Sequence, residues 1–490
     1  MNRGYFFMRK TLGFLLSVVC GLLCVLGACS FSKGEKERTV YEIVAEYRPD
    51  DCAMTGTVKV DYYNDFETEV DCLKFQLYPN GYRENALLSP IGYDVATEAY
   101  YAGRSYGEIT VSSVLGASRY EVGGADKNIL YVYLEQPVAP QGRVVVDIGF
   151  TTRLAKVNHR LGVSKKAVNF AGVFPVLCGV EDGTFFECAP CDIGTPVFAD
   201  CADFSLKLTM PKEYALSCPG KVEEGSLESK KRYTVSLSNA RELAFCAAEG
   251  YQVAKGQTGR TDIRFYHFEG ENAGAAVELA GRAIEYFSSL FGEYPYDSFV
   301  FARTGATEQA FDQAGHCMIS HRVAGKEFAV ALLSGIAAQW WYAGVGANRV
   351  QHPWQVDGLT AYAVSLFLEK YPEYGCTGKE FVAAAQGNYR TYKDTYERAF
   401  GWVDARIDRG LGEFVNDYEY KAVARDKALL MFDELEKGIG RKKTLAGLRK
   451  YYAENLHSTV LPANLVGAFE RIGVDVVGFF DGYLGGKGTF

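Results

Sequence analysis

The side chains of this chain that could hold a metal ion are few and widely spaced. The six histidines are His159, His267, His316, His321, His352 and His457. Imidazole and carboxylate groups are the usual zinc ligands of hydrolytic enzymes, and His316, His352 and Asp357 could in principle combine into such a site. The favoured interpretation is that these histidines lie at the surface or are hydrogen-bonded within the core.

Nucleophilic catalysis by Ser334 is a second alternative. A nucleophilic serine of the common hydrolase type sits on a sharp turn with the pattern G-x-S-x-G. Ser334 lacks that pattern and lies in the middle of an apolar run with helical spacing. The sequence therefore disfavours a serine hydrolase.

A group of four cysteines is the remaining candidate for metal binding. Of the thirteen cysteines, Cys178, Cys188, Cys191 and Cys201 are closely spaced and contain a single C-x-x-C pair. A four-cysteine zinc site usually has two such pairs. A disulfide or two in a surface loop is therefore expected rather than a structural zinc, with free buried thiols as the other alternative.

The elements that would position these groups differ between the two halves of the chain. In the first half, apolar and polar residues alternate over residues 57–63, 129–134, 143–150, 204–210 and 232–237. Short alternating runs separated by Gly, Asn, Asp and Pro are typical of an antiparallel β-sandwich. We therefore expect a β-sandwich domain over residues 40–258.

The second half has helical spacing. Apolar residues recur with this period over residues 275–291, 326–343, 357–370, 418–437, 442–454 and 462–472. The run 326–343 is apolar almost all round, which predicts a buried helix. A mainly helical domain is expected over residues 262–490, giving a multidomain β plus α fold.

Charge and composition exclude some classes of partner. The formal net charge is −8, and no basic stripe occurs, so nucleic acid is not expected as a partner. The hydrophobic content of 48% supplies enough apolar surface for more than one core. The chain is also longer than a single core normally allows.

The N-terminus has the pattern of an export signal. Arg9 and Lys10 precede a mostly apolar run over residues 11–25, shorter than the roughly 20 residues of a membrane span. The run ends in L-G-A-C at residues 26–29, which resembles the bacterial lipobox. The resemblance implies a signal peptide over 1–28, a lipid on Cys29, a tether over 29–39 and a bacterial lipoprotein held on the extracytoplasmic face of the cell membrane. A transmembrane anchor is the alternative.

Several segments resemble, in order, motifs of the M1 family of zinc aminopeptidases. In the helical half these are Y-F-S-S-L-F-G at 286–292 with Y-P-Y at 294–296, Q-W-W-Y at 339–342 and P-W-Q-V-D-G-L-T at 353–360. In the β half, L-Y-P-N at 77–80 and R-E-L-A-F at 241–245 are similar to family landmarks. The resemblance implies an N-terminal β-sandwich domain followed by a thermolysin-like (gluzincin) domain.

The chain departs from the family at the zinc site. In the family an H-E-x-x-H helix precedes Q-W-W-Y and supplies two zinc-binding histidines and the general base, and a glutamate 19 positions later is the third ligand. The histidine positions are Ser334 and Ala338, the third-ligand position is Asp357, and the base position is Gly335. Alanine has no donor atom, and a serine hydroxyl binds zinc poorly. No intact metal site and no cofactor are therefore expected.

Two further family positions are also changed. The family's catalytic tyrosine lies two residues before a lysine, and A-R-D-K-A at 424–428 places Arg425 there. The acid that binds the substrate's α-amino group in the family aligns with Asp312, or with Glu308 in an alternative alignment. Asp312 and Asp357 are thus the expected substrate-binding residues of a residual amine-binding pocket.

These substitutions predict a protein that binds without cutting. The expected function is that of a non-catalytic M1-like surface lipoprotein, or pseudopeptidase, with a peptide or partner protein in its cleft and the membrane bound through Cys29. The alternative is an active zinc metallopeptidase with a rearranged site formed by His316, His352 and Asp357. A structural lipoprotein whose cleft binds nothing is a third possibility.

Overall fold

The computed structural model describes residues 36–487, and one compact unit begins at Thr39. The predicted signal peptide, Cys29 and most of the predicted tether lie outside the described residues. None of the helices in the described part is both long and apolar enough to cross a membrane.

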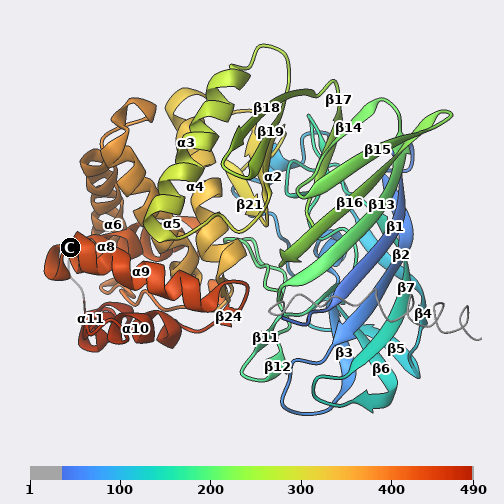
Figure 1. The fold of residues 1–490 in the computed structure, drawn as a ribbon, viewed down its shortest axis with the longest axis horizontal. Coiled ribbons are helices and arrows are strands. Elements are labelled where there is room, and N and C mark those ends of the chain that lie inside the picture. The colour runs from blue at the N-terminus through green and yellow to red at the C-terminus, as the bar shows by residue number, and fades with distance from the viewer. Residues whose placement is uncertain (1–35, 488–490) are drawn as a thin grey trace, which may run out of the picture. The chain divides into compact units, whose positions relative to one another are not determined.

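The N-terminal half is built on a seven-stranded sheet (Figure 1) with the strand order β15-β16-β13-β1-β2-β7-β4. Its strands are β1 (Val40–Arg48), β2 (Ala53–Tyr63), β4 (Glu108–Leu115), β7 (Arg143–Arg153), β13 (Ala202–Pro211), β15 (Lys221–Leu227) and β16 (Lys230–Ala240). Neighbouring strands are antiparallel except for the parallel pair β1 and β13. Along β1 every second residue from Tyr41 to Tyr47 is buried, so one face of the sheet covers the core.

Two four-stranded sheets complete this half, with the orders β10-β3-β6-β5 and β14-β17-β9-β8. Their strands are β3 (Val70–Gln76), β5 (Arg119–Gly123), β6 (Ile129–Val138), β8 (Leu161–Val163), β9 (Val168–Phe170), β10 (Val176–Leu177), β14 (Tyr214–Ser217) and β17 (Cys246–Glu249). A hairpin of β11 (Val180–Glu181) and β12 (Thr184–Phe185), the 3-10 turn η1 (Tyr78–Tyr82) and the short helix α2 (Ala96–Ala99) lie between them in sequence.

The C-terminal half contains a five-stranded sheet with the order β18-β19-β20-β22-β21. Its strands are β18 (Gln252–Thr258), β19 (Thr261–His267), β20 (Ser298–Thr304), β21 (Ala310–Gln313) and β22 (His316–Ser320). The domain boundary expected between residues 258 and 262 falls in the turn between β18 and β19, and it stays a prediction.

Helices make up most of this half. They are α3 (Ala273–Phe291), α4 (Gly325–Ala338), α5 (Pro353–Lys370), α6 (Gly378–Phe400), α7 (Asp417–Tyr420), α8 (Ala428–Ile439), α9 (Arg441–Asn455), α10 (Pro462–Glu470) and α11 (Val477–Leu484). Two π-helical turns, η2 (Gln339–Gly344) and η5 (Lys421–Lys427), continue α4 and α7. The predicted fold class, a β-sandwich region followed by a mainly helical region, is confirmed.

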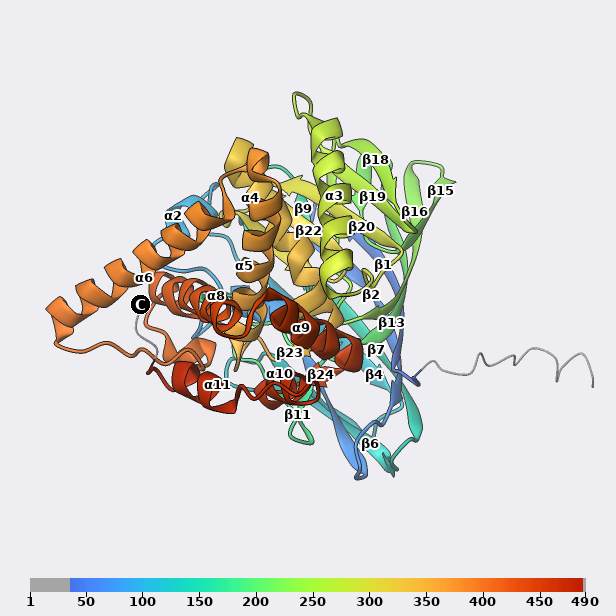
Figure 2. The ribbon, with the colours of Figure 1, turned by 60° about the vertical axis from the view of Figure 1, so that its left-hand side comes forward.

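The longest helix, α6, falls where the apolar pattern predicts none. It is largely solvent-facing, with buried positions at Gly378, Ala385, Tyr389 and Tyr392, and Figure 2 shows its C-terminal end standing clear of the other helices. A capping box starts it, because Thr377 Oγ1 accepts from Glu380 N at 3.2 Å while Thr377 N donates to Glu380 Oε2 at 2.8 Å. The capping box is therefore a sequence signal for the start of this helix.

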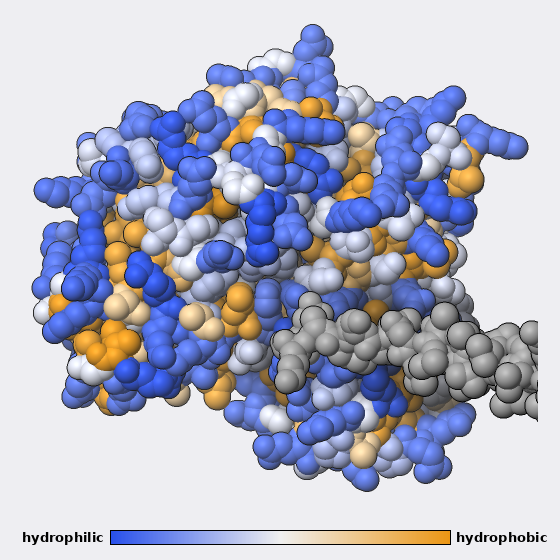
Figure 3. All heavy atoms as spheres, viewed as in Figure 1, coloured by the Kyte–Doolittle hydropathy of each residue, from blue (hydrophilic) through white to orange (hydrophobic). Residues whose placement is uncertain are grey.

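Apolar side chains gather in the interior rather than on the surface. Trp340 packs edge-on against Phe287 at 5.7 Å between ring centroids, and Trp341 packs against Phe291 at 4.8 Å. The face drawn in Figure 3 is mostly hydrophilic, with its apolar residues in small separate groups. The tryptophan pair, which lies in the π-helical turn that continues α4, is thus part of the buried core.

Candidate functional site

Helix α4 carries the three positions that correspond to the family's two histidines and general base. It packs closely against β22 at Gly335, where a Cβ atom would lie only 2.4 Å from Cys317 Sγ. Gly335, Ala338 and Cys317 are all buried. The thiol therefore occupies the space into which any side chain at residue 335 would extend.

Gln339 fixes the end of α4 to the turn between β21 and β22. Its Nε2 donates to the carbonyl oxygens of Gln313 and Gly335, both at 2.9 Å, and its Oε1 accepts from Gly315 N at 2.8 Å. A buried amide with three hydrogen bonds holds a single orientation. This side chain positions strand β21, which carries Asp312, beside α4.

The segments R-E-L-A-F at 241–245 and Q-W-W-Y at 339–342 are far apart in sequence but meet at Tyr342. Arg241 Nε donates to the Tyr342 carbonyl at 2.9 Å, and the Tyr342 hydroxyl donates to Glu242 Oε1 at 2.7 Å. Burial raises the pKa of Glu242 to about 7, against the opposing effects of the Tyr342 hydrogen bond and the charge of Arg160. Glu242 is thus a buried carboxyl close enough to Asp312 for the charge of Asp312 to raise its pKa further.

Arg349 brings Asp312 and Asp357 together. Its Nη1 lies 3.0 Å from Asp312 Oδ2, and its Nη2 lies 3.7 Å from Asp357 Oδ1. The guanidinium also lies over the Tyr342 ring, 4.5 Å from the centroid. Burial alone would lower the pKa of Arg349, but the two carboxylates raise it above its ordinary value. The two aspartates singled out in the sequence do share one site, and its centre is an arginine that no motif had indicated.

Tyr420 completes the surroundings of Asp357, because its hydroxyl donates to Asp357 Oδ2. Burial raises the pKa of Asp357, although the charge of Arg349 and this hydrogen bond both favour the ionised form. A Cβ atom on Gly194 would lie 3.0 Å from the Tyr420 hydroxyl, so a loop of the β half covers the tyrosine from the other side. Both oxygens of Asp357 are therefore engaged by groups of the chain itself.

The histidines of the rearranged-site alternative are placed apart from Asp357. His316 is buried against Ser217 Oγ at 3.0 Å, and burial lowers its pKa to about 3. His352 Nδ1 lies 2.6 Å from Asp408 Oδ1. Within residues 36–487 no three His, Cys, Asp or Glu side chains lie close enough to hold a metal ion together. His316, His352 and Asp357 thus do not form one cluster.

The donor set at the family's zinc position does not fit zinc. Ala338 offers no donor atom, and Ser334 offers only a neutral hydroxyl. Asp357 is bound to Tyr420 and lies beside the guanidinium of Arg349, whose positive charge would repel a divalent cation. Imidazole and thiolate, the ligands zinc prefers, are missing from these three positions.

Two other predicted site residues, Arg425 and Glu308, interact with neighbours of their own. Arg425, at the family's tyrosine position, pairs with Asp426 at 3.1 Å and lies 5.7 Å above the Phe381 ring. Its charge acts on Asp357 by lowering the pKa of that carboxyl. Glu308, the alternative to Asp312, accepts from Thr307 Oγ1 at 2.8 Å, and burial raises its pKa. Of these two acids, Asp312 is the one that pairs with Arg349.

The disulfides expected in the 178–201 segment do not form, and no disulfide joins the ten cysteines of the described part. Cys178 Sγ donates instead to Gln76 Oε1 at 3.6 Å, and Cys191 Sγ accepts from Ile193 N at 3.4 Å. Cys188 is buried, and burial raises the pKa of its thiol to about 12. The expectation of disulfides was therefore wrong, although the Cys178 and Cys188 thiols lie close enough for their charges to interact.

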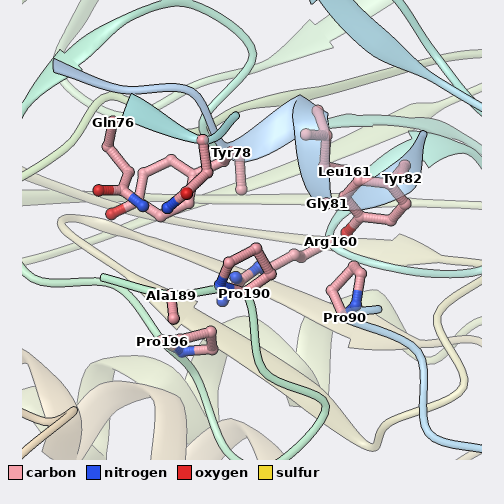
Figure 4. A pocket seen from close by; sticks show the side chains of 12 residues that line it. Gln76, Tyr78, Gly81, Tyr82, Pro90, Arg160, Leu161, Ala189, Pro190 and Pro196 are labelled. Carbon is pink, nitrogen blue, oxygen red and sulfur yellow. The ribbon is translucent and has the colours of Figure 1, made fainter. Parts of the chain in front are cut away.

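A small cavity lies in the β half, lined in part by Tyr82 and Arg160. Its volume is about 20 Å³, which is room for one or two water molecules. Figure 4 shows Arg160 reaching toward Pro190. Arg160 is buried, donates to the Tyr82 hydroxyl and acts on Glu242 by its charge. This cavity is too small for an amino-acid residue of a ligand.

Comparisons with known proteins show the fold. No family model matches the chain, and no curated protein matches its sequence. Solved structures do: the M1 zinc metallopeptidase from Deinococcus radiodurans is 16% identical, with a TM-score of 0.63 over 93% of this chain and 94% of that one. A mutant of that enzyme bound to a Tyr-Ser-Ala substrate has the same identity and coverages and a TM-score of 0.62. A two-domain M1 zinc metallopeptidase mutant bound to L-arginine is 17% identical, with a TM-score of 0.62 over 92% and 94%. The chain therefore has an M1-like two-domain fold.

Proposed function

We propose that this protein is a non-catalytic M1-like surface lipoprotein that binds a peptide or a partner protein. The observation that carries the proposal is the group formed by Asp312, Arg349 and Asp357, in which an arginine of the chain lies between the two acids. In addition, residue 335 is a glycine and so has no carboxylate, and the Cys317 thiol fills the space that a larger side chain there would need.

Peptide hydrolysis by a metallopeptidase requires a bound metal and a general base. The metal lowers the pKa of its bound water from 15.7 to about 7, and the base removes the proton. Within residues 36–487 no donor set that could hold zinc occurs, and residue 335 has no carboxylate. Arg425 could stabilise a negatively charged transition state, but it cannot make a hydroxide nucleophile. This chemistry supports binding over cleavage.

The proposed ligand site is the region around the two aspartates. Their side chains remain 22% and 19% exposed, so a ligand can reach them, although Arg349 is only 5% exposed. A solved neighbour in this fold is bound to a Tyr-Ser-Ala substrate and others to single amino acids. These ligands support a peptide, or a segment of a partner protein, as the group bound by this chain. Membrane attachment through a lipid on Cys29, on the extracytoplasmic face, belongs to the same proposal.

The test measures zinc content and hydrolysis on one sample. The full chain is purified in detergent, dialysed, assayed for zinc by elemental analysis and incubated with aminoacyl fluorogenic substrates, with the Deinococcus radiodurans enzyme as a positive control. We expect no retained zinc and no turnover above background. About one equivalent of zinc with chelator-sensitive turnover would refute the proposal and favour the rearranged metal site.

A further inference from the structure

The cavity beside Tyr82 and Arg160 holds a buried positive charge that no acid of the described part pairs with. Arg160 is only 7% exposed, and within residues 36–487 it forms no ion pair. A guanidinium group keeps its proton in proteins, so burial cannot make it neutral as it can a carboxyl or a lysine. A buried charge without a partner of opposite sign is strongly unfavourable. An anion beside Arg160 would therefore be favoured.

The ionisable groups near Arg160 supply little negative charge. Burial raises the pKa of the phenols and thiols and lowers the pKa of the imidazole in a set of five groups that are therefore uncharged at neutral pH: Tyr78, Tyr82, His159, Cys188 and Cys191. Glu242 is the exception, but burial raises its pKa to about 7 against the charge of Arg160. At pH 7 this carboxyl is therefore protonated in about half of the molecules.

Hydrogen-bond donors line the cavity together with this charge. Gln76 and Asn128 each donate one amide N–H to the Cys188 carbonyl, at 2.5 and 2.6 Å, while their amide oxygens accept from other groups. An amide NH₂ group has two hydrogens, so each of these residues keeps one donor for a ligand. The Tyr78 hydroxyl also lines the cavity, and it donates to no group of residues 36–487.

The size of the cavity selects the anion. Its volume of about 20 Å³ holds one or two water molecules. A chloride ion is only slightly larger than water, whereas sulfate, phosphate and the carboxyl end of a peptide are much larger. Ala189 lines the cavity and is exposed, so an ion can enter from solvent on that side. Figure 4 shows Arg160 reaching toward Pro190, the next residue.

We propose that this cavity binds a single chloride ion through four groups: the guanidinium of Arg160, the amides of Gln76 and Asn128, and the hydroxyl of Tyr78. The anion neutralises the buried guanidinium and accepts hydrogen bonds from the amides and the hydroxyl. None of these residues belongs to the group around the two aspartates. The inference therefore goes beyond the proposed function.

The line width of the chloride NMR signal measures this binding on the full chain in detergent. Sodium gluconate keeps the ionic strength constant, because gluconate is too large for the cavity. We expect the protein to broaden the chloride signal and added bromide, which competes for the same site, to reverse the broadening. Arg160→Met keeps most of the side-chain volume and removes the charge, so it should lose the broadening that bromide reverses. Arg48→Met is the matched control, since it removes an arginine whose side chain is 45% exposed and should change nothing.

Thermal melts provide a second readout. An ion that binds only the folded state stabilises it in a saturable manner. Exchange of gluconate for chloride should therefore raise the Tm of the wild type and of Arg48→Met by roughly 1–3 °C and leave that of Arg160→Met unchanged.

The proposal is overturned if the wild type gives no bromide-reversible broadening, or if Arg160→Met gives as much as the wild type. An equal loss in Arg48→Met also overturns it, because the effect would then come from surface charge. If Arg160→Met does not fold, wild-type crystals soaked in bromide decide. An anomalous peak within hydrogen-bond distance of the Arg160 guanidinium supports the proposal, and no peak there overturns it. Since these experiments involve neither zinc nor hydrolysis, their failure would leave the proposed function standing.

Discussion

Gly335→Ala, at the position aligned with the family's general base, has two opposing effects on stability: a gain in helix propensity and a loss in core packing. In a solvent-exposed helix, alanine in place of glycine stabilises by about 1 kcal/mol. In this protein the new Cβ atom would lie 2.4 Å from Cys317 Sγ and 3.2 Å from its Cβ. Carbon and sulfur atoms in contact are normally more than about 3.4 Å apart, so the Cys317 side chain, α4 or β22 must shift by about 1 Å.

The packing effect is expected to outweigh the propensity effect. Inserting an atom into a well-packed core costs about 1–3 kcal/mol. We therefore expect Gly335→Ala to lower the free energy of unfolding by up to about 2 kcal/mol, after the helix-propensity gain is subtracted. Replacing Cys317 with alanine removes the sulfur, so in that background Gly335→Ala should be neutral or stabilising.

The assay is urea-induced unfolding followed by tryptophan fluorescence, or Tm where unfolding is irreversible. Gly387→Ala is the matched control, because Gly387 lies in α6 and a Cβ atom added there would meet no other side chain within 4 Å. That substitution should stabilise by about 0.5–1 kcal/mol. Stabilisation by Gly335→Ala, or an equal loss with and without Cys317→Ala, would refute the argument that the thiol closes the base position.

Two further predictions concern a buried acid and a helix cap. Because the pKa of Glu242 is raised to about 7 by burial, the folded state keeps a proton that the unfolded state releases near pH 4.5, and stability is lost as pH rises through this window. Glu242→Gln should therefore gain about 2–3 kcal/mol on the wild type between pH 5 and pH 8, and melting curves with a difference independent of pH would contradict this. Thr377→Ala should cost about 1 kcal/mol by removing the cap of α6, whereas Thr391→Ala, which loses only a bond to the Gly387 carbonyl, should cost less; equal losses in thermal melts would show that the cap is not important.

The elements with a strong pattern could be predicted from the sequence, and the others could not. The alternation in β2 and β7 and the apolar spacing of α3 and α9 are local properties, and those elements occur close to the expected residues. Helix α6 was not predicted because most of its residues are polar, although its buried residues Ala385, Tyr389 and Tyr392 recur at helical spacing. The run at 326–343 ends in a π-helical turn at Gln339, a change that depends on how this turn packs.

For the candidate site, too, some features could be predicted from the sequence and others could not. The resemblance of Q-W-W-Y at 339–342 to the family's motif implies that Ser334, Gly335 and Ala338 stand at the positions of the zinc ligands and the base, and their residue types argue against that chemistry. Only the tertiary structure shows that Cys317 fills the space at Gly335. The pairing of cysteines was also mispredicted, because sequence spacing does not reveal which thiols face each other.

The sequence by itself therefore determined which residue types stand at the positions aligned with the family's zinc site, because the type of a residue fixes whether it can bind zinc or accept a proton. The tertiary structure decided which groups surround those positions. Arg349 lies 37 residues from Asp312 in sequence, and their contact depends on how β21, the segment before α5 and the Tyr342 ring pack together. Such contacts follow from the arrangement of whole elements in space, which no local spacing encodes.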